Sequence, residues 1–135
     1  MKKIITLFVL FLSIGIANAQ TEAETLEWLN TKKAEAQYIN STTVTSNYGG
    51  KLEITNEILH VYNDEGAYTK INWNEIKDIK QQNKDILIIS NSMYNGKNSN
   101  ISFYISNEEL RPKYLKALKH MATLKGAKLV NDDLF

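Results

Sequence analysis

The chain has 135 residues with 16 basic and 15 acidic side chains, which gives a formal net charge of +1, and it contains no cysteine. The lack of cysteine excludes disulfides, thiolate nucleophiles and thiolate metal sites. A charge this close to zero, with Arg111 as the only arginine, argues against a nucleic-acid partner.

The first predicted element is a removable signal peptide at residues 1–19. Two lysines precede an apolar run from Ile4 to Ile16, and Ala19 ends a small-x-small cleavage site before Gln20. The run is too short for the roughly 20 apolar residues that a membrane-spanning helix needs. We therefore predict an exported mature chain, periplasmic or secreted. We expect this mature chain to have no transmembrane segment, and no lipid anchor, since it lacks a cysteine that could carry one.

Residues 22–36 are predicted to form a helix. Thr21 and Glu24 have the spacing of a capping box, in which each side chain accepts a hydrogen bond from the other residue's backbone N–H. The apolar stripe that follows is narrow and contains Leu26 and Leu29, with Trp28 beside them. Because so narrow a stripe cannot form a core of its own, we expect this helix to pack on the rest of the fold.

Residues 41–106 are predicted to form a β-meander, because apolar and polar residues alternate and turn residues recur. About seven runs have strand character: Thr43–Thr45, Lys51–Thr55, Ile58–Tyr62, Ala67–Trp73, Ile76–Ile79, Ile86–Ile89 and Ile101–Ile105. Short strands that follow one another through turns are typical of a barrel or sandwich.

Two segments of the meander depart from simple alternation. Ile86–Ile89 consists of four apolar residues in succession, which indicates a strand covered on both faces. The polar stretch Asn91–Asn100 is predicted as a loop. Its Met93 and Tyr94 either make contacts with a partner or belong to a mobile segment without a role.

The turn at Asp64-Glu65-Gly66 allows a prediction of strand register. If Leu59 and Ile71 both face the core, a three-residue loop pairs them, and it places Gly66 at the left-handed position that such loops require. A two-residue loop would put Leu59 opposite a polar residue. The opposite face of this hairpin then collects the side chains that we name the aromatic face: Ile58, His60, Tyr62, Tyr68 and Lys70.

The aromatic face is the candidate partner surface, because apolar and aromatic residues turned away from a core are typical of binding sites. A competing interpretation is that the helix at 22–36 lies on this face and buries it with Leu26, Trp28 and Leu29. The position of that helix decides between the two.

A second helix is predicted over residues 109–125. Pro112 sets its start, since proline fits only in the first turn, and Gly126 ends it. The side chains at helical spacing that form its apolar stripe are Leu110, Tyr114, Ala117, Leu118, Met121 and Leu124. A short tail follows, whose Leu134-Phe135 end is apolar. Residues 20–135 are thus predicted to form a single α+β domain.

The order of these elements resembles the pleckstrin-homology-like (PH-like) barrel. Residues 66–79 are similar to a strand, hydrophobic-x-x-x-Ile-x-x-Ile, strand passage in GRAM-type members, and Ala117–Met121 with Gly126 and Phe135 resembles small exported bacterial proteins of uncharacterised function. The resemblance implies a seven-stranded antiparallel barrel or sandwich with a C-terminal capping helix, here with an extra N-terminal helix. Phosphoinositide-binding members carry a basic cluster in the first hairpin loop. Residues 46–51 hold one lysine, so no binding residue is carried over.

No catalytic, cofactor-binding or metal-binding residue is predicted. The two histidines, His60 and His120, lack the spacing of metal ligands, and no nucleophile motif is present. The acidic pairs Asp64-Glu65 and Glu108-Glu109 are explained by a turn and a helix start. We predict a non-catalytic module for an unknown protein or peptide. A carrier of a small apolar ligand or lipid, and a hydrolase with two dispersed carboxylates, remain open alternatives.

Overall fold

The computed structural model describes residues 21–45 and 50–130. The predicted signal peptide with its cleavage site at Ala19 and Gln20, and the tail end at Leu134-Phe135, lie outside the described residues. In the part of the chain that is described, no helix is long and apolar enough to cross a membrane.

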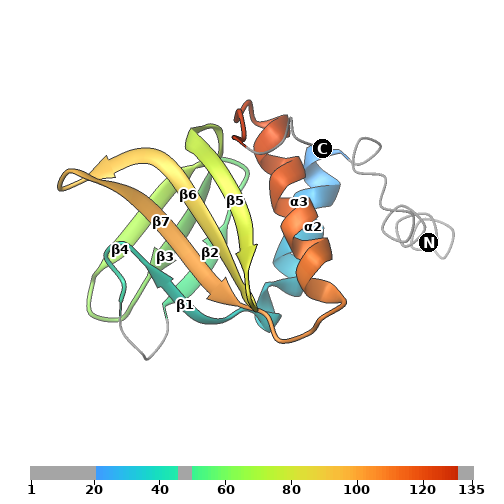
Figure 1. The fold of residues 1–135 in the computed structure, drawn as a ribbon, viewed down its shortest axis with the longest axis horizontal. Helices are drawn as coiled ribbons and strands as arrows, with labels where there is room; N and C mark the ends of the chain where they lie inside the picture. The colour runs from blue at the N-terminus through green and yellow to red at the C-terminus, as the bar shows by residue number, and fades with distance from the viewer. Residues whose placement is uncertain (1–20, 46–49, 131–135) are drawn as a thin grey trace, which may run out of the picture.

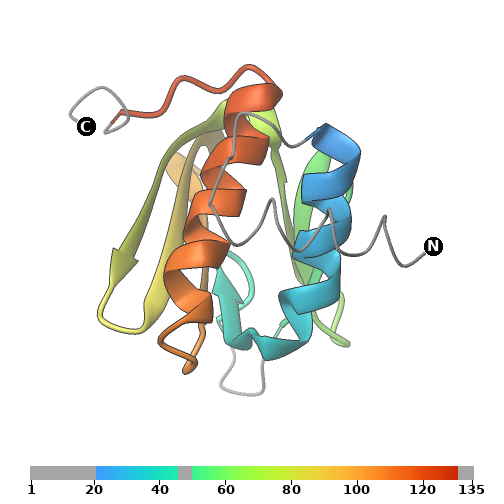
Figure 2. The same cartoon turned by 90° about the vertical axis from the view of Figure 1, so that its right-hand side faces the viewer.

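Two antiparallel sheets face each other, and two helices lie side by side across one end of them (Figures 1 and 2). The four-stranded sheet, in spatial order, contains β1 Gln37–Ser41, β7 Lys97–Tyr104, β6 Asp85–Tyr94 and β5 Ile76–Gln82. The three-stranded sheet contains β2 Lys51–Ile54, β3 Ile58–Tyr62 and β4 Tyr68–Asn72, with β3 in the middle. The helices are α2 Glu22–Lys32 and α3 Leu110–Leu124. The predicted architecture of seven strands, a C-terminal helix and an extra N-terminal helix is confirmed.

The core between the sheets consists of every second side chain along the strands, which points inward. Leu59, Val61 and Ile71 of the three-stranded sheet are fully buried, as are Ile88 and Ile101 of the other sheet. Residues between them on the same strands point outward and are partly or largely exposed. Buried and exposed side chains therefore alternate along these strands, with the same period of two residues that predicts them from the sequence.

The residue before β2, Gly50, is bonded to β1 of the other sheet. The backbone N–H of Gly50 donates to the Ile39 carbonyl at 2.7 Å. A Cβ atom at Gly50 would lie 2.8 Å from Cγ1 of Val61 and 3.0 Å from Cγ1 of Val44, so a side chain does not fit there without displacement. Glycine thus allows β1 and β2 to close this side of the barrel.

The start of the meander differs from the prediction. Helix α2 ends at Lys32, a 3-10 turn follows at Lys33–Glu35, and the first strand already begins at Gln37. The predicted strand at 43–45 is not a strand. Ser41 and Val44 close a turn, with the Ser41 N–H donating to the Val44 carbonyl at 2.8 Å. Val44 is fully buried, so its β-branched side chain fills the core and does not mark a paired strand.

The predicted loop at Asn91–Asn100 is instead the distal end of the β6–β7 hairpin. Strand β6 continues to Tyr94 and β7 starts at Lys97. The turn residues Asn95 and Gly96 have φ values of 51° and 79°, as a two-residue type I′ turn requires. This end of the hairpin carries polar residues on both faces, so its strands lack the apolar alternation that marks the others.

Ile86–Ile89 is not covered on both faces, contrary to the prediction. Ile86 and Ile88 are fully buried, whereas Leu87 and Ile89 are half-buried on the outer face. The helices lie across the end of the sheets, so they leave the outer face of β6 without a covering layer (Figure 1).

Both ends of α3 follow the prediction, but its apolar stripe is rotated. The helix starts at Leu110, and Gly126 at φ 97° closes it while the Ala127 N–H donates to the Ala122 carbonyl at 2.9 Å. Leu124 is 45% exposed and Ala122 is fully buried. The buried stripe follows the row of residues four apart, which passes through Leu110, Tyr114, Leu118 and Ala122 and turns away from Leu124.

Candidate functional site

The β3–β4 hairpin has the predicted register. Leu59 pairs with Ile71 and Tyr62 pairs with Tyr68, and the Asn63 N–H donates to the Ala67 carbonyl at 3.0 Å across the three-residue loop 64–66. Gly66 adopts φ 93°. The Asn63 side chain holds the loop, because its Oδ1 accepts hydrogen bonds from the backbone N–H groups of Glu65 and Ala67, both at 3.0 Å.

The register brings all five predicted residues onto the outer face of the three-stranded sheet. The ring of His60 stacks on Tyr62 with centroids 4.9 Å apart and lies edge-on to Tyr68 at 6.0 Å. The Nζ atom of Lys70 lies 5.5 Å from the centroid of the Tyr68 ring, within cation–π range. The aromatic face is therefore a set of mutually packed rings with a cation at its edge.

Strand β2 adds two charged residues to this face that were not among the five predicted for it. Glu53 Oε1 lies 3.4 Å from His60 Nδ1, and Lys51 Nζ lies 3.0 Å from Asp64 Oδ1. The hydrogen bond that Lys51 donates to Asp64, together with the negative charge of Asp64, raises the pKa of Lys51. The alternation in β2 placed both residues outward, and this signal could have identified them. Lys70 differs from Lys51, because no described carboxylate lies within ion-pair distance of it.

Helix α2 does not cover the aromatic face, so the competing interpretation is wrong. It packs against α3 (Figure 2), where the Tyr114 hydroxyl donates to the Leu29 carbonyl at 3.0 Å and the Trp28 ring lies 5.7 Å from that of Tyr114. The Asn30 amide also reaches the Ile54 carbonyl at 3.1 Å, at the end of β2. Tyr68 is accordingly 57% exposed.

Two shallow grooves adjoin each other on this side of the molecule. The first, the ring groove, lies over His60, Tyr62 and Tyr68. The second, the edge groove, runs between β4 and the β6–β7 hairpin, where Met93 and Ser92 form the opposite wall. Both grooves include Gly66, Ala67, Tyr68 and Lys70. Met93 is 62% exposed, so the residue predicted to lie in a loop is instead a strand residue at the wall of the edge groove.

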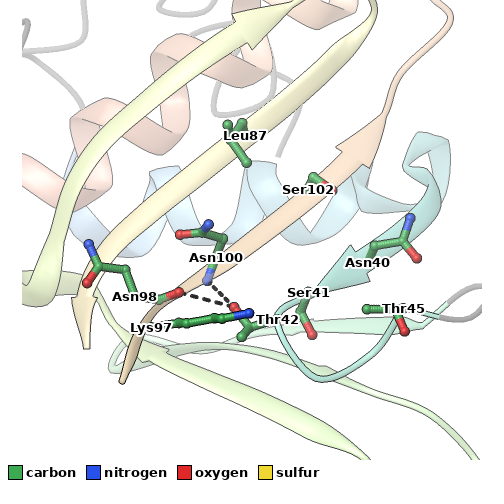
Figure 3. Close-up of a pocket in the computed structure, with 9 residues that line it drawn as sticks. All are labelled: Asn40, Ser41, Thr42, Thr45, Leu87, Lys97, Asn98, Asn100 and Ser102. Atoms are coloured by element: carbon green, nitrogen blue, oxygen red, sulfur yellow. Dashed lines mark hydrogen bonds between the residues drawn. The ribbon is translucent and has the colours of Figure 1, made fainter. Parts of the chain in front are cut away.

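A third groove lies on the outer side of the four-stranded sheet (Figure 3). Amides and hydroxyls dominate its lining, together with one leucine and one lysine: Asn40, Ser41, Thr42, Thr45, Leu87, Lys97, Asn98, Asn100 and Ser102. The Thr42 hydroxyl donates to the Asn98 carbonyl at 3.3 Å and accepts from the Asn100 N–H at 2.7 Å. These bonds fasten the connection after β1 to β7 and give Thr42 a structural role, whereas Oδ1 of Asn100 is buried and bonds to no described residue.

Glu75 links the 3-10 turn after β4 to the wall of the edge groove. Its Oε1 accepts hydrogen bonds from the Ser92 hydroxyl at 2.8 Å and from the Asn72 amide at 2.7 Å. These bonds lower the pKa of Glu75 from its ordinary value of 4.5, the Ser92 bond most strongly. The carboxylate thereby holds Ser92, and with it the neighbouring Met93, next to β4.

This carboxylate predicts a pH-dependent contribution to stability. The pKa of Glu75 is lower in the folded protein than its ordinary value of 4.5. The carboxylate therefore stabilises the fold above pH 4.5, and this stabilisation disappears as the pH falls through the pKa of the folded protein. We expect Glu75→Gln to reduce the free energy of unfolding by less than about 1 kcal/mol at pH 7, because the carboxylate is partly exposed to solvent, which screens its interactions. Urea denaturation should show that the difference from wild type narrows below pH 4.5. A difference that is the same at pH 3 and pH 7 would contradict this assignment.

Comparisons with known proteins agree with the fold. No protein-family model matches the chain, and no curated protein matches it in sequence. A solved structure described as "PH domain from PfAPH" aligns with a TM-score of 0.56 and 15% sequence identity, covering 81% of this chain and 98% of that one. Similarity at this identity shows the fold alone. The protein therefore has a PH-like fold.

Proposed function

We propose that the protein is an exported, non-catalytic binding module for a protein or peptide and that the aromatic face is its binding surface. The observation that carries the proposal is the uncovered, packed set of rings on β3 and β4, with Tyr68 57% exposed. A tyrosine side chain loses little conformational entropy when a partner binds to it, and tyrosine is frequent among the residues that contribute most to binding energy. The signal-like segment at residues 1–19 supports export.

The core supports a surface function rather than a carrier. Between the sheets and the helices, the side chains of Leu29, Phe103, Tyr114 and Leu118 are fully buried. The rings of Phe103 and Tyr114 meet edge to face with centroids 5.7 Å apart. An apolar ligand held there would have to displace this packing, which favours the protein or peptide partner over the small-ligand alternative.

The composition of the grooves also supports binding rather than hydrolysis. The three grooves described above contain no aspartate or glutamate in their linings. A hydrolase with two carboxylates needs both acids about 5–9 Å apart around the scissile bond. In the described ranges, no three side chains of His, Asp or Glu gather in a way that suits a metal ion.

The double variant Tyr62→Ala with Tyr68→Ala tests this proposal. Random twelve-residue peptides displayed on phage are first selected on the mature chain, residues 20–135. We expect the double variant to bind the selected peptides at least about 100-fold more weakly, since truncation of a central aromatic residue typically costs about 2 kcal/mol or more. Its melting temperature should stay nearly unchanged, because the two side chains lie outside the core.

Tyr38→Ala is the matched control, because Tyr38 is 64% exposed but lies on β1 in the other sheet. It should leave peptide affinity unchanged. Equal binding by the double variant and the wild type would contradict the proposal, and a large fall in melting temperature would show that the rings are structural. Export is tested by the intact mass of protein recovered from its host: retention of residues 1–19 would argue against it.

A further inference from the structure

Strand β4 separates the ring groove from the edge groove, and it is an edge strand, since it pairs only with β3. The Asn63 N–H donates to the Ala67 carbonyl at 3.0 Å, which makes this pair hydrogen-bonded. Bonded and non-bonded pairs alternate along an antiparallel ladder, so the pairs at Thr69 and Ile71 are also bonded. The backbone groups of Tyr68 and Lys70 therefore point away from β3, toward the edge groove.

Another residue closes one end of this edge, because the Thr43 hydroxyl donates to the Tyr68 carbonyl. Near the other end, the side-chain amide of Asn72 donates to Glu75 Oε1 at 2.7 Å. Between them, the N–H and C=O of Lys70 bond to no described residue. The edge is thus open at Lys70, with a donor and an acceptor that match one residue of an added strand.

The charge at this position is unbalanced. Lys70 has no described carboxylate within ion-pair distance, and neither adjoining groove contains an acidic residue in its lining. Apolar surface flanks the cation on both sides, because Tyr68 and Met93 are both more than half exposed. The complementary occupant therefore carries a negative charge next to apolar side chains.

A second copy of the chain fits this edge poorly. If two copies paired symmetrically about the open position, Lys70 would lie directly opposite the same residue of the other copy. Like charges placed opposite each other on paired strands are destabilising, and an exposed edge lysine is a common barrier against such pairing. A different partner, with the opposite charge, meets no such barrier.

We propose, on the basis of the function proposed above, that the partner is an extended acidic peptide segment that adds to β4 at Lys70. One of its residues makes two backbone hydrogen bonds with Lys70. An aspartate or glutamate of the segment pairs with the Lys70 ammonium group, and alternate side chains contact Tyr68 on one side and Met93 on the other. Lys70 is then the residue that determines charge specificity, and the tyrosines supply apolar contact area.

The test uses the peptides selected from the random phage library. We expect them to be enriched in Asp and Glu, and we expect Lys70→Glu to weaken their binding at least about 10-fold. Peptides in which the critical acid is replaced by lysine should bind Lys70→Glu better than they bind wild type. Lys70→Met removes the charge and keeps the length of the side chain. Its affinity for the selected peptides should lie between that of the wild type and that of Lys70→Glu. Lys84→Glu is the control, because Lys84 is an exposed lysine in the β5–β6 turn, away from both grooves.

Hydrogen exchange measured by NMR tests the backbone contact. The Lys70 amide should exchange quickly in the free protein and slowly in the peptide complex. If peptides bind through Tyr62 and Tyr68 but Lys70→Glu has no effect, or the Lys70 amide stays unprotected, the proposed function stands and the edge proposal fails. If no peptide is selected, both fail. Protection of Lys70 that rises with protein concentration and without peptide would assign the edge to a second copy and overturn the acidic partner.

Discussion

Tyr114→Ala is expected to lower the free energy of unfolding by about 3–5 kcal/mol, the range for loss of a fully buried aromatic side chain. The Tyr114 ring is fully buried where α2, α3 and the four-stranded sheet meet. It lies 5.7 Å from the rings of both Trp28 and Phe103. Its removal leaves a cavity among three elements, and the surrounding backbone can relax only partly into it.

Tyr114→Phe separates the contribution of the hydroxyl from that of the ring. The hydroxyl donates to the Leu29 carbonyl at 3.0 Å, and burial raises the pKa of Tyr114 above its ordinary value of 10.0, so the group stays protonated well into the alkaline range. We expect a loss of about 0.5–1.5 kcal/mol for this variant. Urea denaturation measures both variants, and the exposed neighbour Lys113→Ala should change stability by less than about 0.5 kcal/mol. A loss below about 1.5 kcal/mol for Tyr114→Ala would contradict the central position of this ring.

The same variants bear on the binding surface. The bond from Tyr114 to Leu29 holds α2 beside α3 and away from the aromatic face. Tyr114→Phe should therefore leave the affinity for selected peptides unchanged as long as α2 remains docked. The effect on stability and the effect on binding are thus expected to separate, which distinguishes the residues that support the fold from those that contact a partner.

Trp73→Ala is the second change with a large expected effect, again about 3–5 kcal/mol. Trp73 begins the 3-10 turn between β4 and β5, where the chain passes from one sheet to the other, and its side chain is fully buried. The indole Nε1 donates to the Thr55 carbonyl at 2.8 Å, and the Trp73 backbone N–H donates to the Glu57 carbonyl at 3.2 Å. One residue thus fills the core and also fixes the β2–β3 turn beside the aromatic face.

Trp73→Phe retains part of the buried area and removes the bond to Thr55, so its loss of stability should be smaller than that of Trp73→Ala. Asn74→Ala is the control, since Asn74 is the exposed neighbour in the same 3-10 turn. Thermal and urea unfolding should place the three variants in the order Asn74→Ala, Trp73→Phe, Trp73→Ala by increasing loss. A similar loss of stability for Asn74→Ala and Trp73→Ala would show that the passage of the chain between the two sheets does not depend on the indole.

The features that were predicted correctly depend on interactions between residues close in sequence. The capping box joins Thr21 and Glu24, with the Glu24 N–H donating to the Thr21 hydroxyl at 3.1 Å. The loop at Gly66 and the register of the hairpin follow from face parity over fewer than fifteen residues. Gly126 ends α3 because only the local backbone has to adopt a left-handed conformation.

The incorrect predictions have physical causes that can be named. The end of the β6–β7 hairpin carries no apolar alternation, which predicts a loop, although Asn95-Gly96 is a strong hairpin signal by itself. The β-branched side chain of Val44 predicts a strand, but this residue is buried within a turn. Helical spacing predicts Leu124 in the apolar stripe, whereas the packing of α3 buries Ala122 instead.

The sequence alone determined the length of the chain, its near-neutral charge and its lack of cysteine. It also determined the alternation along the strands and the composition of the aromatic face. Local geometry is sufficient for these features, since each depends on neighbours in the chain or on a period of two or 3.6 residues. Only the tertiary structure decided that α2 packs on α3 and leaves Tyr68 exposed, and that Met93 faces β4. It also decided that the Thr43 hydroxyl bonds to the Tyr68 carbonyl at the β4 edge and leaves the backbone groups of Lys70 open beside it. These features join distant segments, and they depend on which surfaces bury the most apolar area together, which no local pattern encodes.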